Sequence, residues 1–286
     1  MINTNTVKNI LLRALTAVIL FLMPNTNYGQ SPTLGNAAKF ILFTTNGAMT
    51  CSGTKYLTHL TGEVGSNLAG SVTGFGNVDG VMHTFDGATG LCTPDVISLY
   101  TQLSTAIPTA TLATPFGSGA TLFAGTYFLS GASTMTGTLI LDGQGNPNAQ
   151  FIFQIGGVFS TNALSKVKLI NGALACNVFW QVGGAVNIGT GTSIKGTIVA
   201  NGQIDMTSTL DTLEGRALAL NAAVLVSQLV AYTPLGCGSP YLTGPAAPAL
   251  VSTASYGVFS SIGAVTSATP LIPKSRKLKY NKPSKR

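Results

Sequence analysis

The segments Gly196-Thr-Ile-Val-Ala-Asn-Gly202 and Gly215-Arg-Ala-Leu-Ala-Leu-Asn221 share one form, in which a glycine opens a short, mostly apolar run that ends in Asn or Gly. Three similar segments lie upstream, at Gly125–Gly131, Phe151–Gly157 and Val178–Gly184. The starting residues of the five are 26, 27, 18 and 19 positions apart. A short unit that returns at nearly constant spacing is typical of a solenoid, in which each coil buries its apolar side chains only against neighbouring coils.

Each of these segments continues into further short strands. A second stretch with alternating polarity follows the glycine, as in Ser133–Thr136 and Ile204–Thr207, and in most units a third follows, as at Leu139–Leu141. Three strands of about five residues with tight corners make a coil of about 18 residues, and coils stack at the ~4.8 Å spacing of paired strands. The sequence therefore predicts a mostly β fold, a triangular β-solenoid.

One stretch breaks the β pattern and predicts a helix. Thr93-Pro94-Asp95 has the form of a helix start, with a capping residue, a proline at the first helical position and an acidic residue in the first turn. An apolar stripe follows before Pro108, made of Val96, Leu99, Tyr100, Leu103 and Ile107. We therefore expect one amphipathic helix at residues 93–108, packed along one side of the solenoid.

The composition excludes several classes of protein. Of the 286 residues, 45% are hydrophobic, only 8% are charged and 34 are glycine, which fits neither a disordered chain nor a long solvated coiled coil. The formal charge of +7 comes from the two ends, because residues 31–235 hold six basic residues against all eight acidic ones. Such a body offers no phosphate-binding patch, so we expect no nucleic-acid partner.

The two ends of the chain differ from this body. Residues 1–29 have a basic start, an apolar run from Ala14 to Met23 and small polar residues before Gly29, which predicts a cleaved secretory signal. The run is too short to span a bilayer, so we expect a secreted or extracellular protein with no membrane span in the mature chain. Residues 237–286 have the composition of a Pro/Ala/Ser/Thr linker and a basic tail. Two interpretations of the tail remain open: a solvated segment, or an electrostatic contact with an anionic cell envelope that keeps the protein at the cell surface.

The chain contains four cysteines, an even number that indicates disulfides in an exported protein. Three pairings are possible in principle. Cys51 with Cys92 and Cys176 with Cys237 is the pairing favoured by closeness in the sequence, but the sequence alone does not decide among the three.

Four motifs in this order and spacing resemble the secreted microbial ice-binding (antifreeze) proteins, which are built as a discontinuous β-solenoid with a flanking α-helix. The motifs are Leu139–Gln154, Asn171–Val182, Gly196–Ala200 and Gly215–Ala219. The resemblance covers about Leu34 to Val226, and residues 51–92 resemble the capping insertion of some members. It implies that residues 30–236 form a domain that adsorbs to ice crystals through a flat face and inhibits ice growth and recrystallisation. It implies no catalysis.

The resemblance places the ice-binding face on the second strand of each coil, and alternation along the strands then gives the outward side chains. The expected ice-binding residues are Ala132, Thr134, Thr136, Ser160, Asn162, Ala185, Asn187, Thr207, Ala222 and Val224. Ala48 and Thr50 of the N-terminal unit would add another row. Gln203 and Asp205 differ from this set, because a long amide and a hydrated charge depart from a flat, weakly hydrated surface.

The residues also allow other classes of function. A cell-surface adhesin or structural solenoid would use the same face to bind a polysaccharide or a protein. A polysaccharide-cleaving enzyme would need paired acids, or an Arg or Lys base, in one groove, and the sequence shows no such cluster. Because His59 and His83 lie in no metal-ligand spacing, we expect neither a metal nor a cofactor.

Overall fold

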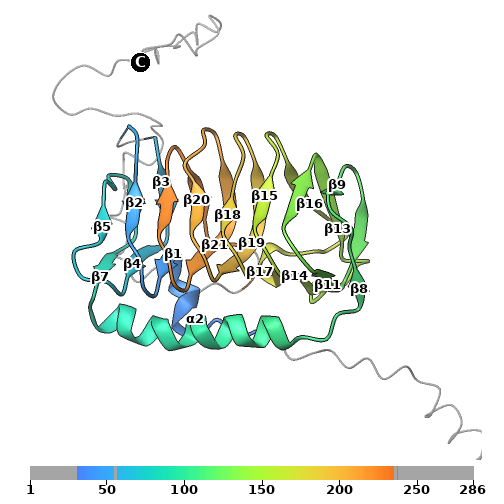
Figure 1. Cartoon of the computed structure of the whole chain (residues 1–286), viewed down its shortest axis with the longest axis horizontal. Helices are drawn as coiled ribbons and strands as arrows, with labels where there is room; N and C mark the ends of the chain where they lie inside the picture. Colours follow the sequence, from blue (N-terminus) through green and yellow to red (C-terminus); the bar gives the residue numbers. More distant parts are fainter. Residues whose placement is uncertain (1–30, 55–56, 235–236, 238–286) are drawn as a thin grey trace, which may run out of the picture. The chain divides into compact units, whose positions relative to one another are not determined.

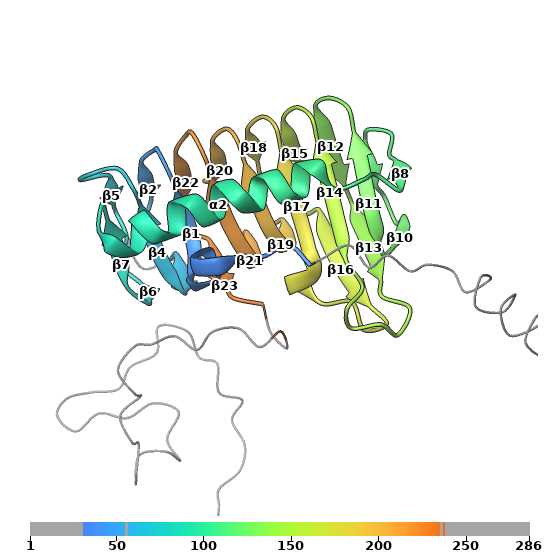
Figure 2. The same cartoon turned by 90° about the horizontal axis from the view of Figure 1, so that it is seen from below.

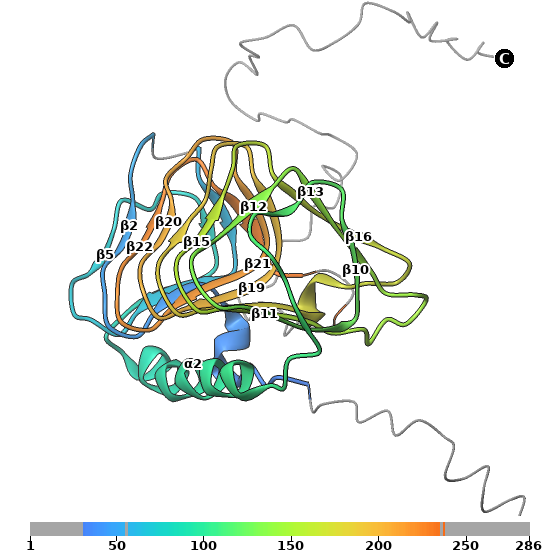
Figure 3. The ribbon, with the colours of Figure 1, turned by 45° about the vertical axis from the view of Figure 1, so that its right-hand side comes forward.

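The computed structural model describes residues 31–54, 57–234 and 237, and these form a stack of coils with parallel strands on three faces (Figures 1 and 3). In most coils one short strand lies on each face, and the chain turns a corner between consecutive strands. The predicted β-solenoid is confirmed. We name its sides the helix-covered face, the eight-stranded face and the third face.

The strands of each face follow one another in an order that is not the order of the sequence. The helix-covered face consists of β7 (Met82–Thr84), β4 (Glu63–Ser66), β1 (Phe40–Thr44), the second halves of β21 (Thr212–Ala219) and β19 (Ser193–Ala200), β17 (Val178–Val182), β14 (Phe151–Ile155), β11 (Gly125–Leu129) and β8 (Ala110–Thr111). The eight-stranded face consists of β5 (Val72–Thr73), β2 (Met49–Cys51), β22 (Val224–Val226), β20 (Ile204–Met206), β18 (Val186–Asn187), β15 (Phe159–Thr161), β12 (Ser133–Thr136) and β9 (Phe116–Gly117). The third face consists of β6 (Val78–Asp79), β3 (His59–Thr61), β23 (Val230–Tyr232), the first halves of β21 and β19, β16 (Lys166–Ile170), β13 (Thr138–Asp142) and β10 (Thr121–Phe123).

The stack is discontinuous in sequence. Strands β1, β2 and β3 pair on one side with β21, β22 and β23, and on the other side with β4, β5 and β6. The N-terminal coil therefore lies between the last repeat coil and the coils of residues 63–84, and blue and orange strands are neighbours in Figure 2.

Two long strands turn the corner between the third face and the helix-covered face without a loop. Strands β19 and β21 pair along their whole length, and Gly196 and Gly215 lie opposite each other at the bend. A Cβ atom on Gly215 would lie 1.8 Å from the carbonyl oxygen of Gly196, and the φ of Gly215 is +158°. Only glycine fits such a close approach of two backbones. This explains why a glycine opens each of these two repeat segments.

The helix, α2, runs from Gly87 to Thr105 and lies across the strands of the helix-covered face (Figure 2). The expected start at Thr93 and end at 108 are wrong. Asp86 is the N-cap: its carboxylate accepts from the N–H groups of Ala88 and Thr89, and the Thr89 hydroxyl accepts from the Asp86 N–H at 2.9 Å. The hydrogen bond from Thr89 lowers the pKa of Asp86 below its ordinary value.

Tertiary packing explains both helix boundaries. Thr89 and Cys92 are buried, so contacts with the sheet extend the helix through the weakly helix-forming Gly87 and Gly90 and leave Pro94 inside it. At the other end, the Gln154 side chain donates to the carbonyl oxygens of Leu103 and Ala106, both at 2.7 Å. Ile107 lies beyond the helix and is 85% exposed, so it is not part of the buried stripe. The expected packing of one helix along one side of the solenoid is confirmed.

The apolar side chains form two cores. The inner core fills the triangle, and in it the Trp180 ring stacks on both Phe153 and Phe159 of the neighbouring coil, with centroid distances of 4.1 and 5.3 Å. The Trp180 indole N–H donates to the Lys195 carbonyl oxygen at 2.9 Å. The second core lies between α2 and the sheet and contains Phe179, the neighbour of Trp180 on the same strand. Alternation along one strand therefore supplies both cores.

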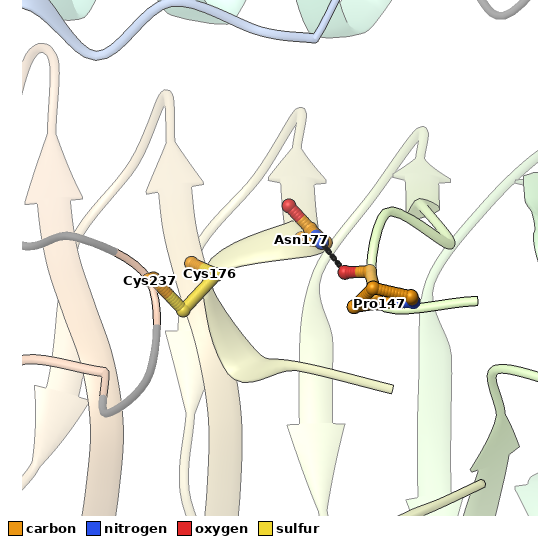
Figure 4. Close-up of a disulfide and its surroundings, with 4 residues drawn as sticks. All are labelled: Pro147, Cys176, Asn177 and Cys237. Carbon is orange, nitrogen blue, oxygen red and sulfur yellow. Dashed lines mark hydrogen bonds between the residues drawn. A yellow bond between two sulfur atoms is a disulfide. The ribbon is translucent and has the colours of Figure 1, made fainter. Parts of the chain in front are cut away.

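One of the two expected disulfides is present. Cys176, in the 3₁₀ helix η2 (Ala175–Asn177), is bonded to Cys237 (Figure 4). The expected Cys51–Cys92 bond is wrong, because both thiols are free and buried. Cys51 belongs to the inner core and its thiol donates to the Thr58 hydroxyl, whereas Cys92 on α2 packs in the outer core. Strands of the helix-covered face separate the two cores, so these sulfur atoms cannot meet.

A second 3₁₀ helix, η1 (Gly35–Lys39), leads into β1 and is held to α2, where the Asp95 carboxylate accepts from the Asn36 N–H at 2.6 Å. No helix among the described residues has the length and apolar character needed to cross a membrane. The expected secretory signal at 1–29 and the tail that follows Cys237 lie outside the described residues.

Candidate functional site

The outer surface of the eight-stranded face is a ladder of small, in-register side chains. Strand pairing aligns one central outward column, which runs Thr134, Ser160, Asn187, Asp205, Leu225, Thr50 and Thr73. A flanking column, aligned by backbone hydrogen bonds at the start of each strand, contains Val158, Ala185, Gln203, Ala223 and Ala48. Neighbouring strands are spaced by about 4.8 Å, so these groups repeat regularly along the stack.

Eight of the ten expected residues lie on the outer side of this face. Ala132, Asn162, Asn187 and Thr207 are exposed, and Thr134, Thr136, Ser160 and Ala185 are half-buried. The side chains between them point inward and are buried, as Ser133, Met135 and Phe159 are. Ala48 and Thr50 are half-buried beside the buried Met49, so the expected extra row is present.

The expectations for Ala222 and Val224 are wrong. Val224 pairs with Ile204, and both side chains are fully buried in the inner core, so Val224 faces away from the surface. Ala222 lies in the preceding turn. The physical reason is the length of a corner: residues 201–203 connect β19 to β20, but residues 220–223 connect β21 to β22. The additional residue moves the last strand by one position and therefore reverses which side chains face outward.

Residues that the pattern missed take the outward positions. Leu225 faces outward on β22, Ala223 does so immediately before that strand, and Thr73 does so on β5. Aligning the two glycine-initiated segments places Ala223 opposite Ile204, whereas the structure pairs Ile204 with Val224, so the sequence repeat alone did not reveal the longer corner.

Hydroxyl groups on this face are held by short contacts. Thr136 Oγ1 lies 2.8 Å from Ser118 Oγ in the neighbouring coil, and the Thr134 N–H donates to the hydroxyl of Thr114 at 3.0 Å. The Thr207 hydroxyl donates to Asp205 Oδ1 at 2.6 Å. Together with the stacked aromatic core beneath, these contacts fix the positions of the outward groups before any ligand arrives.

Charged groups gather away from this face. Lys166 and Lys168 project from β16 on the third face, and Lys195 pairs there with Glu214 across two coils. At the end of the stack formed by residues 63–84, His83 Nδ1 lies 2.7 Å from the Asp86 carboxylate. Within the described residues, no group of three His, Cys, Asp or Glu side chains is arranged to hold a metal ion. Asp205 is thus an exception among the outward residues of the eight-stranded face.

A buried carboxyl group lies at the corner between the eight-stranded face and the third face. Asp211 is fully buried, and its Oδ1 accepts from the Thr192 N–H at 3.0 Å, while its Oδ2 has no hydrogen-bond partner among the residues that the structure describes. Burial raises the pKa of Asp211 to about 6, against the lowering effect of the hydrogen bonds from Thr192 and Gly191. This group supports the corner from inside and does not face the surface.

The comparisons with known proteins agree with this geometry. The family profile described as "Ice-binding-like" matches residues 43–231. The ice-binding protein of Nostoc sp. (strain HG1) is 36% identical over 167 residues, which cover 58% of this chain and 62% of that protein. The crystal structure of an ice-binding protein from an Antarctic bacterium of the Flavobacteriaceae is 50% identical with a TM-score of 0.72, covering 78% of this chain and 52% of that one.

A structure from a fungus gives a similar result at lower identity. The ice-binding protein of the Antarctic ascomycete Antarctomyces psychrotrophicus is 31% identical with a TM-score of 0.66, covering 71% of this chain and 98% of that one. The chain spans only about three fifths of the Nostoc relative and half of the Flavobacteriaceae protein. Because the profile covers most of the solenoid and its repeat coils, this chain belongs to the ice-binding-like family.

Proposed function

We propose that this protein adsorbs to ice crystals through the outer surface of the eight-stranded face and so inhibits ice growth and recrystallisation. The observation that carries the proposal is the ladder of in-register hydroxyl, amide and small apolar side chains on successive strands of one face. The proposed contact residues are those expected from the sequence, with Ala223 in place of Ala222 and Val224.

The eight-stranded face is preorganised to bind ice. Ice is a regular array of water, so a binding surface must hold water in a matching array at low entropic cost. Parallel strands repeat every ~4.8 Å, and the packed aromatic core leaves them little freedom to move. Hydroxyl and amide groups hydrogen-bond surface water, while the small apolar groups between them bind water weakly. The ordering cost of docking is therefore largely met when the protein folds.

This function needs neither a reaction nor a cofactor, and we propose that the protein is not an enzyme. The relatives compared above are named for binding ice, and the comparisons give no support to the alternative of a polysaccharide- or protein-binding surface module. The expected action is therefore physical adsorption to a crystal surface.

The N-terminal segment, the disulfide and the basic tail bear on where the protein acts. We propose that the chain acts outside the cell, because its sequence begins with a predicted signal and it contains a disulfide. Cys176 lies between β16 and β17, at the corner opposite the eight-stranded face. The disulfide therefore holds Cys237, the start of the 237–286 segment, away from the proposed ice surface. We propose that the basic residues of the 237–286 segment contact an anionic cell envelope.

The test compares two tyrosine substitutions in one coil. Thr134→Tyr puts a bulky ring on the proposed ice surface, and Thr138→Tyr puts the same ring on the third face. Both threonines are half-buried and lie four positions apart. Thermal hysteresis and recrystallisation inhibition should be lost in Thr134→Tyr and retained in Thr138→Tyr, with both variants folded by circular dichroism. If the folded parent has no activity, ice is not the ligand; if the two variants behave alike, the face is wrong.

A further inference from the structure

Asp205 lies at an internal position of the proposed ice surface. It follows Thr134, Ser160 and Asn187 in the central outward column and precedes Leu225 and Thr50. On one side of its strand, β20, lie β22, β2 and β5, and on the other side lie β18, β15, β12 and β9. A charge at this position is therefore surrounded by the surface and not placed at its rim.

The carboxylate of Asp205 is fixed in place by its own strand. Oδ1 accepts from the Thr207 N–H at 3.0 Å and from the Thr207 hydroxyl at 2.6 Å. Among the described residues, no lysine, arginine or histidine forms an ion pair with it. The charge is thus held on the surface without a cation to neutralise it, and its remaining lone pairs face water.

A fixed, unneutralised carboxylate opposes contact with ice. A carboxylate orients several waters around itself. Removing these waters raises the free energy of the system, unless another charge or hydrogen-bond donor takes their place. The ice lattice offers neutral water in fixed orientations. Docking over Asp205 therefore costs free energy that the neutral side chains of the same column do not cost.

The composition of the face differs on the two sides of Asp205. Towards β12, the central column continues with hydroxyl and amide groups on three consecutive strands: Asn187, Ser160 and Thr134. Towards β2, the first neighbour is the branched, half-buried Leu225, and Thr50 follows. The longer uninterrupted polar column lies on the β12 side.

We propose that Asp205 sets the boundary of the ice-docking surface and weakens adsorption, so that the native protein docks mainly through β12, β15 and β18. This inference rests on the proposed function and assigns a specificity-determining residue within it. Removing the charge joins the two parts of the face into one larger docking surface and strengthens binding.

The first experiment compares two isosteric substitutions that each remove one negative charge. Asp205→Asn keeps the acceptor oxygen that Thr207 uses. The matched control is Asp142→Asn on the third face, where Asp142 Oδ1 likewise accepts from the Gln144 N–H at 2.8 Å and from the Asn171 side chain at 2.9 Å. For Asp205→Asn, the concentration for half-maximal recrystallisation inhibition should fall roughly three- to ten-fold, equivalent to about 0.7–1.4 kcal/mol. Asp142→Asn should match the parent.

The second experiment locates the boundary. Thr134→Tyr and Thr50→Tyr place the same ring on the central column, on either side of Asp205, and both threonines are half-buried. In the parent, Thr134→Tyr should abolish activity and Thr50→Tyr should leave most of it. In the Asp205→Asn background, Thr50→Tyr should remove the gain from the first substitution, which is a coupling that independent sites do not show.

The outcomes separate this inference from the proposed function. An inactive parent overturns both. An active parent in which Asp205→Asn behaves as Asp142→Asn does, or in which Thr50→Tyr alone is as damaging as Thr134→Tyr, overturns the boundary at Asp205 and leaves ice binding by the whole face intact.

Discussion

The buried carboxyl group of Asp211 is expected to make the solenoid less stable as the pH rises from about 4 to about 6. The perturbation is Asp211→Asn, which keeps the acceptor oxygen for the Thr192 N–H and replaces the unpartnered Oδ2 with an amide nitrogen. Burial raises the pKa of Asp211 from 3.8 to about 6 in the folded protein. In the unfolded chain the carboxyl group recovers its ordinary value.

The direction of this pH dependence follows from the number of protons that Asp211 binds in the folded and in the unfolded state. Between about pH 4 and pH 6 the folded protein holds a proton on Asp211 that the unfolded chain has already released, so stability falls as the pH rises through this range. A pKa difference of about two units corresponds to at most ~3 kcal/mol, and we take about 2–3 kcal/mol to allow for residual solvation at the corner. For a domain of this size, that is a shift in melting temperature of roughly 4–12 °C.

The assay is thermal unfolding followed by circular dichroism at several pH values between 3.5 and 7.5 for the parent and Asp211→Asn. The variant has no carboxyl group to titrate at this position. The melting temperature of the variant minus that of the parent should therefore increase by roughly 4–12 °C between pH 4 and pH 7. Other acids, such as Asp86, titrate equally in both proteins and cancel. Parallel melting curves over the whole range would show that Asp211 ionises normally and that its burial does not control its pKa.

Two further predictions concern the backbone and the cysteines. Gly215→Ala should cost more than ~3 kcal/mol or prevent folding, because the new Cβ meets the Gly196 backbone, whereas Gly131→Ala, with open space around it, should change the melting temperature little. Removing the Cys176–Cys237 bond in the double serine variant should lower the unfolding free energy by up to ~4 kcal/mol for its separation of 61 residues, as measured by urea titration. In denaturant without reductant, two thiols per chain should react with a thiol reagent, and a finding of none would mean that Cys51 and Cys92 are bonded.

The parts of the fold that depend on periodicity could be predicted from the sequence. Alternation along Ser133–Thr136 and the glycines at 196 and 215 determine which side chains face the core, and the structure follows them. The pattern failed at Ala222–Val226, where five consecutive apolar residues contain no alternation. There the register depends on the length of the preceding corner, which periodicity does not measure.

Long-range contacts determined the other differences. The start of α2 depends on Thr89 and Cys92 packing against a sheet that forms from distant strands, so the local signal at Thr93-Pro94 was misleading. The Cys51–Cys92 pairing failed for a related reason, since closeness in sequence says nothing about which side of a strand a sulfur atom occupies. For the face itself, alternation gave eight outward residues and also placed Asp205 among the outward side chains, but it missed Leu225, the neighbour of Asp205 on the next strand.

The N-terminal coil lies between the last repeat coil and the coils of residues 63–84, and this position affects how the chain folds. Thr44 and Thr45 bond to Ala222 and Leu220 across separations of 178 and 175 residues, so the first strands reach their final partners only when the solenoid is almost fully synthesised. Most solenoids can grow from any repeat by adding neighbours. Here the N-terminal strands pair only after the C-terminal strands of the domain are available. Both ends therefore fold as one cooperative unit, and folding depends on contacts of long sequence separation.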